Sequence, residues 1–512
     1  MCGRVPWPML PFCLLLSSAL AEPPDPQPST SLQTWILEIE SGSSPAGIAE
    51  QALTLPGTIH AVAGGPFVEV STSSLDLSDL RALPGVALVR EPWPVSVKEV
   101  TTEGLERIQT PKDWLAQGLD GSGVTIAVLD LGFGGLDDLL GDELPEEVSA
   151  WEGGVGSGIT HGTAVCEILH DIAPGAELVI YPFRTEASFI AALEAAEADG
   201  ADIVSASIGF DNVWHADGSS PISQAVDAAA DAGLLYVAAA GNEVGRYSIG
   251  AFSDVDENGW LELDTKERIS LRALSGEMSA SLRWSEPFGQ ADGTLTLVLF
   301  DQDGQECGRS APPQGQNPYV AASCDGVSAL EAGFLALTGE EIPDQGWLYA
   351  PFGVLESIAQ EGTLTLPADA EGALSVGAVE IGTDVAPDYS SQGPTDDGRA
   401  KPNLSAPSQV STATYGSLNF GGTSAATPHV AGLAALAMDH ARRTAPPALR
   451  ENLEQNALDL GEPGPDLIYG AGLVQMGALP QNCGCSTGDR QGSWAWLLAL
   501  GLPLIRRART RA

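Results

Sequence analysis

Short apolar runs recur along the middle of the chain, and they limit its fold more than any other feature. Residues 123–130 read GVTIAVLD, and residues 177–183, 201–209 and 233–242 repeat this pattern. Unbroken apolar runs of this length are typical of strands buried on both faces of a parallel sheet. Alanine-rich stretches such as residues 188–200 lie between them and are typical of helices. We therefore predict a doubly wound α/β domain with a parallel sheet.

Polar side chains stand where these strands are expected to end. Asp130 closes the first run, Ser207 lies near the end of the third, and Asn242 closes the fourth. In open parallel sheets, ligands bind outside the carboxyl ends of the strands. The sequence therefore predicts a working site at this edge of the sheet.

Ser424 lies in the stretch NFGGTSAATPHVAGLAAL, residues 419–436, which admits two interpretations. A serine or threonine in front of an apolar, alanine-rich run is typical of a helix N-terminus. The same small residues around one serine also suit a nucleophile that substrate must approach closely. The motif alone leaves both interpretations open, so a partner base has to decide between them.

Helical geometry excludes two of the six histidines as that base. His429 follows Ser424 by five residues, which turns it roughly 140° around the same helix. His170 lies nine residues after His161 and would face the opposite side of a shared helix. His161, in the stretch HGTAV, remains as the candidate base.

Asp130, His161 and Ser424, in that order, together with Asn242 in AAAGNEVG, resemble the subtilisin-like serine proteases. The resemblance covers residues 102–479 apart from an insertion. Sedolisins are related proteins that carry acids in the corresponding roles, so the histidine and the asparagine argue against them. A subtilisin-like chain implies a serine endopeptidase that acts on proteins or peptides and requires no cofactor or catalytic metal.

The resemblance also assigns roles. His161 would be the general base, Asp130 would orient it, and Ser424 would be the nucleophile. The Asn242 side chain and the Ser424 N–H would form the oxyanion hole. Backbone groups near Ser207 and Gly209, in the stretch SASIG, would pair with an extended substrate.

Three residues depart from the family pattern. Leu131 stands where a serine or threonine usually follows the acid, and Cys166 and Glu167 replace small residues on the His161 helix. We expect Cys166 to pack as a small apolar residue. Leu131 is the one departure that supports an alternative function, a catalytically inactive, subtilase-shaped surface binding or adhesion protein.

The ends of the chain carry targeting signals. Residues 1–21 join Arg4 and an apolar run to Ala19-Leu20-Ala21, a secretory cleavage pattern. At the other end, Cys483 and Cys485 precede an apolar run at 494–505 and arginines at 506–511, an order that resembles the surface-sorting signal of myxobacteria. We predict export, with the enzyme held at the outer-membrane surface or released after processing, and contact with membrane only through this tail.

Changes in the sequence pattern along the chain predict its domains. An α+β unit precedes the α/β region and resembles a subtilase propeptide, so we expect the protein to be a zymogen. Alternating strands with Gly, Asp and Pro turns interrupt the α/β region. The predicted parts are a signal peptide at 1–21, a propeptide-like unit at 22–100, a catalytic domain at 101–250 and 361–479, an all-β sandwich-like insertion at 251–360, and a sorting tail at 480–512.

For an exported protein, the sequence offers candidates for a disulfide and for a structural calcium site. Cys307 and Cys324 lie in one strand-like region and are the best candidates for a disulfide. Residues 254–259 read DVDENG and match the first half of a calcium loop, but Thr265 stands where the loop needs a bidentate glutamate. The alternatives are a structural calcium ion and an acidic turn that opens the insertion.

The net charge of −45 excludes one class of partner. A chain this acidic repels nucleic acid and anionic membrane surfaces. We expect protein or peptide substrates, no nucleic acid, and a monomer.

Overall fold

A central parallel sheet, predicted from the apolar runs, organises the middle of the chain. The computed structural model describes residues 33–40, 42–64, 67–72, 77–90, 101–108, 112–116, 118–154, 156–273, 277–291, 295–310, 317–326, 329–336, 342–440 and 445–476. The strands of this sheet follow the order β21-β20-β9-β8-β5-β7-β6, and every pairing between them is parallel. Their bounds are β5 Thr125–Asp130, β6 Ser149–Ala150, β7 Glu177–Pro182, β8 Ile203–Ala206, β9 Leu235–Ala239, β20 Ala373–Glu380 and β21 Leu404–Ser408.

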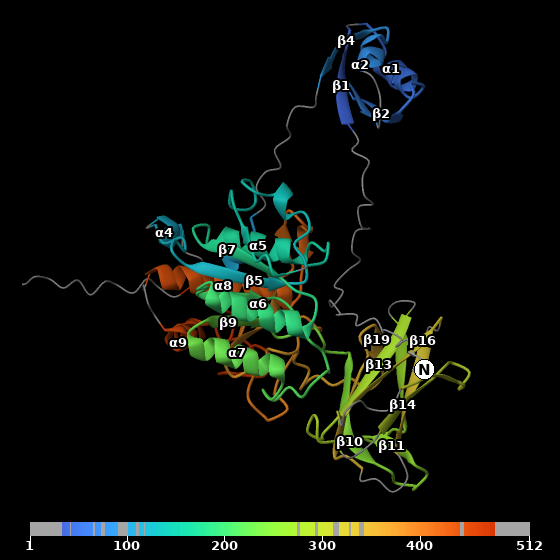
Figure 1. Cartoon of the computed structure of the whole chain (residues 1–512), viewed down its shortest axis with the longest axis vertical. Coiled ribbons are helices and arrows are strands. Elements are labelled where there is room, and N and C mark those ends of the chain that lie inside the picture. Colours follow the sequence, from blue (N-terminus) through green and yellow to red (C-terminus); the bar gives the residue numbers. More distant parts are fainter. Residues whose placement is uncertain are drawn as a thin grey trace, which may run out of the picture. The chain divides into compact units, whose positions relative to one another are not determined.

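Helices cover both faces of this sheet, which confirms the α/β prediction. On one face, side chains of α6 and α7 share a buried cluster with alternate residues of β5, β8 and β9. On the other face, α8 contacts α5 and the strands β8, β9, β20 and β21. Figure 1 shows these helices beside the sheet, with α5 to α7 in teal to green and α8 in orange. Their bounds are α5 His161–Ile172, α6 Glu186–Ala198, α7 Pro221–Ala232 and α8 Thr423–His440.

Shorter elements surround this body. The hairpin of β22 and β23 precedes α8, and α9 follows it. The bounds are α3 Gly104–Arg107, α4 Lys112–Ala116, η1 Leu136–Asp138, β22 Val410–Thr412, β23 Gly416–Phe420 and α9 Pro446–Asn456.

The parallel pairing fixes where the polar residues lie. β5 pairs with β7 on one side and with β8 on the other, and β8 pairs with β9. Because these strands run in one direction, Asp130 at the end of β5, Ser207 after β8 and Asn242 after β9 all emerge at the same edge.

The N-terminal part forms a small α+β unit over residues 33–90. Its antiparallel sheet has the order β2-β3-β1-β4, and α1 and α2 supply helical side chains to its core. The bounds are β1 Gln33–Ile39, α1 Pro45–Ala52, β2 Thr58–Gly64, β3 Phe67–Thr72, α2 Leu77–Arg81 and β4 Val86–Arg90.

The insertion is barrel-like, so the prediction of a sandwich is wrong. Its antiparallel strands join in one continuous sheet of order β15-β14-β17-β11-β10-β18-β13-β16, with β12 paired to β17 and β19. β10 makes this continuity possible, because residues 247–251 pair with β18 and residues 252–253 pair with β11. The bounds are β10 Tyr247–Ser253, β11 Trp260–Leu263, β12 Arg268–Ala273, β13 Glu277–Trp284, β14 Leu295–Phe300, β15 Glu306–Arg309, β16 Tyr319–Asp325, β17 Ala329–Ala336, β18 Gln345–Tyr349 and β19 Gly353–Leu355.

A disulfide joins Cys307 to Cys324, as predicted. Cys307 lies on β15 and Cys324 on β16, the two strands at opposite ends of the sheet order. The bond therefore ties the two ends of the sheet together around one apolar core that contains Cys324, Leu297 and Trp284.

The predicted targeting segments lie outside the described residues, because both the signal peptide at 1–21 and the tail at 480–512 fall outside the ranges given above. In the part of the chain that the structure describes, no helix has the length and apolar character needed to cross a bilayer.

Replacing both cysteines, Cys307→Ser with Cys324→Ser, should destabilise the insertion. The bond closes a loop with a sequence separation of 17, for which the chain-entropy model gives about 3 kcal/mol of stabilisation. Chemical denaturation of wild type and of the double variant measures the difference. Recovery of both cysteines as free thiols from protein made in an oxidising compartment would contradict the assignment.

Candidate active site

The Asp130 carboxylate is fully buried at the end of β5, and hydrogen bonds satisfy both of its oxygens. Oδ1 accepts from the backbone N–H of Leu131 at 2.7 Å and of Gly132 at 3.4 Å. Oδ2 lies 2.7 Å from Nδ1 of His161. Because a buried carboxylate is costly unless it is hydrogen-bonded or paired, these contacts fix the group in one position.

His161 opens α5 and is 7% exposed. Burial lowers the pKa of its ring, the charge of Asp130 and the hydrogen bond to it raise that pKa, and the net shift is upward. The ring of Phe420, from the end of β23, packs edge-on against the imidazole with 5.6 Å between centroids. Because Nδ1 is bonded to Asp130, Nε2 is the ring nitrogen that can accept a proton from a hydroxyl group.

Ser424 is the second residue of α8 and contacts the segment after β8. Its Oγ donates to the carbonyl oxygen of Ser207 at 3.3 Å, and Oγ of Ser207 donates to the carbonyl oxygen of Ser424 at 2.9 Å. These reciprocal bonds connect the α8 N-terminus to the sheet edge that carries Asp130. Among the described contacts, the Ser424 hydroxyl bonds to this carbonyl and not to the His161 ring.

Asn242 stands beside the same helix N-terminus. Its Oδ1 accepts from the backbone N–H of Thr423 at 2.8 Å and from Oγ1 of Thr423 at 3.2 Å. With the carbonyl oxygen held in this way, the amide nitrogen is the end of the side chain turned away from Thr423. Gly422 has a φ of +86°, and a Cβ there would come within 3.1 Å of that nitrogen.

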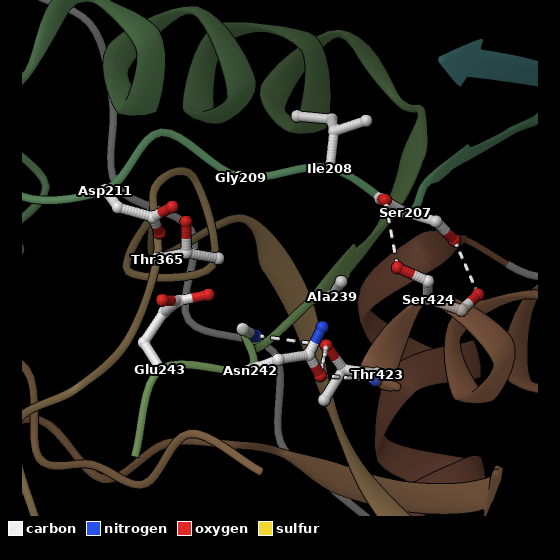
Figure 2. Close-up of a pocket in the computed structure, with 11 residues that line it drawn as sticks. Ser207, Ile208, Gly209, Asp211, Ala239, Asn242, Glu243, Thr365, Thr423 and Ser424 are labelled. Carbon is white, nitrogen blue, oxygen red and sulfur yellow. Dashed lines mark hydrogen bonds between the residues drawn. The ribbon is translucent and has the colours of Figure 1, made fainter. Parts of the chain in front are cut away.

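A pocket opens from Ser424 and Asn242 and is shown in Figure 2. Gly209 contributes one wall, and a Cβ at this position would collide with the side chain of Thr365 across the pocket. The structure thus brings Asn242, Ser207, Gly209 and Ser424 to one pocket, beside the edge where Asp130 holds His161.

The family model described as "Subtilase family" matches residues 121–261 and 353–472, which together make up half of the chain. The chain belongs to the subtilase family. The unmatched residues between the two segments fall in the barrel-like insertion, so the subtilase fold continues on both sides of it.

Two relatives match over part of their length. The chain is 27% identical to an alkaline protease of Alkalihalobacillus alcalophilus over 229 residues, 41% of this chain and 58% of that protein. It is 37% identical to subtilisin E of Bacillus subtilis over 125 residues, 24% of this chain and 31% of that one. The chain thus spans less than two thirds of the length of either relative.

One solved structure supports the fold. The CspB protease of Clostridium perfringens superposes with a TM-score of 0.56 at 16% identity, and the match covers 73% of this chain and 96% of that one. At this identity the likeness shows the fold alone.

The departures from the subtilase pattern have structural explanations. Leu131 needs no hydroxyl to fix the acid, because its backbone N–H donates to Asp130 and its side chain packs into the core. Cys166 is buried, and burial raises the pKa of its thiol, as do the charges of Asp130 and Glu167. The thiol therefore stays protonated and acts as a packing residue.

Glu167 is a buried hydrogen-bond acceptor, a role that the sequence did not indicate. It is 2% exposed, and its carboxylate accepts from the backbone N–H groups of Ala413 and Thr414 and from the Thr414 hydroxyl. Burial raises the pKa of this carboxyl group, and the hydrogen bonds oppose that shift. Glu167 thus ties α5 to the turn between β22 and β23, and β23 ends at Phe420.

His429 lies where the helical geometry predicts, away from Ser424. It is fully buried, with Nδ1 2.8 Å from the carbonyl oxygen of Ala425 and Nε2 3.3 Å from Oγ1 of Thr102. Burial lowers the pKa of the ring to about 4, so this histidine is a neutral core residue.

The acidic loop at residues 254–259 joins β10 to β11. The Asp254 carboxylate accepts from the backbone N–H groups of Asn258 and Gly259, an arrangement typical of an acidic turn. Carboxylate oxygens of Asp256, Glu262 and Glu267 lie within 4.8 Å of one another. Asp254, the first position of the calcium loop considered in the sequence, is not part of this group, so the arrangement differs from that loop.

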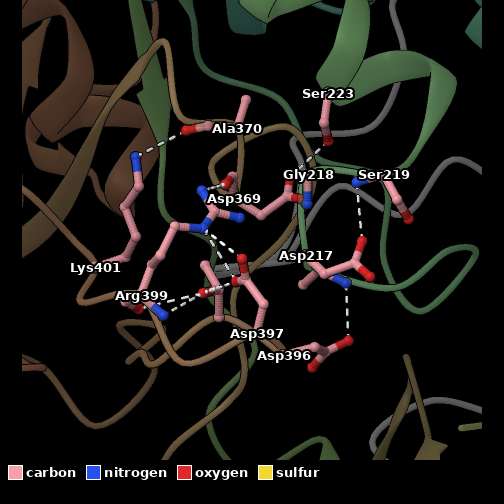
Figure 3. Close-up of polar contacts among 12 residues, drawn as sticks. Asp217, Gly218, Ser219, Ser223, Asp369, Ala370, Asp396, Asp397, Arg399 and Lys401 are labelled. Carbon is pink, nitrogen blue, oxygen red and sulfur yellow. Dashed lines mark hydrogen bonds and ion pairs between the residues drawn. The ribbon is translucent and has the colours of Figure 1, made fainter.

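A buried lysine supports the loop behind the pocket. Lys401 is 3% exposed, and its Nζ donates to the carbonyl oxygens of Ala370 and Ala373 and to Oδ1 of Asn403. Figure 3 shows Lys401 bonded to Ala370, which directly follows Asp369, and the Asp369 carboxylate accepts from Gly218 and Ser223. Burial lowers the pKa of Lys401 to about 7.

The sequence analysis did not identify four polar residues at or beside the pocket: Asp211, Glu243, Thr365 and Tyr349. Glu243 directly follows the predicted Asn242, so the GNE triplet was a usable signal for it. Tyr349 belongs to β18 of the insertion and is separated from Glu243 by 106 positions along the chain. No local pattern could have assigned it to this site.

Replacing Glu167 with alanine should destabilise the protein by about 2–4 kcal/mol, because the hairpin amides would lose their buried acceptor. Chemical denaturation measures the loss. The matched control is Glu194→Ala on the exposed side of α6, which should change stability by less than about 0.5 kcal/mol. Equal stability of the two variants would contradict this role of Glu167.

Proposed function

We propose that the chain is a serine endopeptidase that cleaves peptide bonds in proteins with Asp130, His161 and Ser424. The observation that carries this proposal is the 2.7 Å contact between the buried Asp130 carboxylate and Nδ1 of His161. It favours the tautomer in which Nε2 is unprotonated and can act as a base. Membership of the subtilase family supports the same assignment.

In the first step, Ser424 Oγ attacks the carbonyl carbon of the scissile bond while His161 Nε2 takes its proton. The hydroxyl turns about χ1 from its contact with the Ser207 carbonyl toward the imidazole ring. The Asp130 carboxylate stabilises the imidazolium that forms.

The tetrahedral intermediate carries a negative oxygen that needs donors. Ser424 lies in the first turn of α8, where backbone N–H groups have no acceptor within the helix. Its N–H and the amide nitrogen of Asn242 supply two donors. His161 then gives its proton to the leaving amine, and water hydrolyses the acyl-enzyme by the same steps.

The substrate would lie along the backbone of residues 207–209, which continues from β8 past Ser424. Such pairing requires an extended segment of polypeptide, so unfolded or loop regions of proteins are the expected substrates. The chemistry calls for no cofactor, because the base, the nucleophile and the oxyanion donors all come from this chain.

We further propose export through residues 1–21, an inhibitory propeptide role for the α+β unit, and retention at the outer-membrane surface or release through residues 480–512. The secretory cleavage pattern supports the first, the position of the α+β unit before the subtilase domain supports the second, and the Cys483–Cys485 tail order supports the third.

Wild-type protein should hydrolyse denatured casein, and Ser424→Ala should lower the rate by about 10⁴-fold or more, since the nucleophile is lost. Release of acid-soluble peptides measures the rate. The Ser424→Ala chain should also keep its N-terminal unit, whereas active protein loses it between about residues 95 and 103.

Comparable rates for wild type and Ser424→Ala would contradict the proposal. An identical N-terminus on both proteins would contradict self-processing. It would not bear on the protease assignment, which the casein assay tests. The matched control is Ser417→Ala, which removes an exposed hydroxyl on β23 and should leave the rate within about twofold of wild type.

The pH profile should report His161. Because Asp130 raises the pKa of the ring, kcat/KM should rise with pH through an apparent pKa above about 6.5, the ordinary histidine value. Below that pKa the ring is protonated and cannot act as base. Asp130→Asn should remove the upward shift and lower kcat steeply; an activity that increases as pH falls below about 6 would contradict this account.

A further inference from the structure

The pocket beside Ser424 ends at two carboxylates. Asp211 and Glu243 line it together with Thr365, and Figure 2 shows all three side chains directed toward one another. Glu243 is 3% exposed and Thr365 is 2% exposed. The pocket therefore joins the proposed nucleophile to an acidic end.

The polar groups at this end are only partly satisfied. The hydroxyl of Tyr349 lies 2.8 Å from Oε2 of Glu243 and 3.2 Å from Oδ2 of Asp211, but it has one proton to donate. Oδ1 of Asp211 and Oγ1 of Thr365 are buried, and the Thr365 hydroxyl lowers the pKa of Asp211 as a donor would, although the two side chains do not meet in normal hydrogen-bond geometry. Buried polar atoms of this kind favour a ligand that can donate to them.

One cation lies near the pair and neutralises part of its charge. Nη1 of Arg246 is 3.7 Å from Oε2 of Glu243, and the same nitrogen donates to the carbonyl oxygen of Pro351 at 2.8 Å. With both carboxylates ionised, these three side chains leave one negative charge without a partner. An anionic side chain in the pocket would be repelled, and with an apolar one the second carboxylate would be neutralised by a bound proton instead of a cation.

We propose that this pocket receives a lysine or arginine side chain, the one on the residue whose carbonyl group Ser424 attacks. The inference rests on the proposed function, because it assigns the substrate class of that same site. A bound ammonium or guanidinium group would donate to Oδ1 of Asp211 and pair with Glu243.

Electrostatics at the site agree with this assignment. Burial and the charge of Glu243 raise the pKa of Asp211 to about 8 against the opposing effect of the Thr365 and Tyr349 hydroxyls, and burial also raises the pKa of Glu243. Without a bound cation the two groups therefore hold a proton between them at neutral pH. The charged group that faces them is Arg246, which cannot supply a full counter-charge to both.

The insertion contributes to this specificity. Tyr349 lies at the end of β18, while Asp211 and Glu243 follow β8 and β9 of the subtilase sheet. The Tyr349 hydroxyl lies within hydrogen-bond distance of both carboxylates and donates its one proton to one of them at a time.

The test compares peptide p-nitroanilides that differ only in the residue before the scissile bond: lysine, arginine, phenylalanine or glutamate. Wild type should show kcat/KM at least about 30-fold higher for lysine or arginine than for phenylalanine. Asp211→Asn should lower kcat/KM for the lysine substrate by about 30-fold and change that for phenylalanine by less than about threefold. Asparagine keeps an acceptor for Tyr349, and Asp231→Asn, on the exposed end of α7, is the matched control.

A higher kcat/KM for phenylalanine, in an enzyme that still hydrolyses casein, would overturn this inference and leave the proposed function standing. An Asp211→Asn variant that lost activity equally on lysine and phenylalanine substrates would also overturn it. If Asp211→Asn failed to fold, the wild-type ranking of the four substrates would still decide. Absence of hydrolysis of every substrate, casein included, would overturn both.

Discussion

The burial of the Asp130 carboxylate is the constraint on which the rest of the site depends. A charge without exposure to solvent needs partners in fixed positions, and here they are two backbone amides and the ring of His161. The parallel sheet supplies the position, because β5 lies between β7 and β8 and delivers the acid to the edge where Ser207 contacts Ser424. The histidine is thereby oriented before any substrate binds.

Contacts between distant segments stabilise the surroundings of that edge. Glu167 connects the helix that carries His161 to the hairpin that ends at Phe420, whose ring packs on the imidazole. Lys401 stabilises the loop that follows Thr365, because its Nζ donates to two carbonyl oxygens there. The insertion takes part as well, because the Tyr349 hydroxyl donates to Glu243, one of the carboxylates that line the pocket.

Local patterns predicted the sheet and the positions of Asp130, Ser207 and Asn242, because the burial and the end of a strand can be recognised from a few consecutive residues. The sandwich prediction was wrong because β10 changes partners within the strand, and strand pairing is not visible in the alternation of side chains. Glu167 could not be assigned from sequence either. Its acceptor role depends on a hairpin that begins to contact it 246 positions further along the chain.

Labelling of the folded protein with a fluorophosphonate probe tests the central claim most directly, because the probe reacts only with a serine that a neighbouring base activates. The account predicts one labelled residue, Ser424, and loss of labelling in His161→Ala, which keeps the serine but removes its base. Failure of the wild-type protein to react, or equal labelling of the His161→Ala variant, would contradict it.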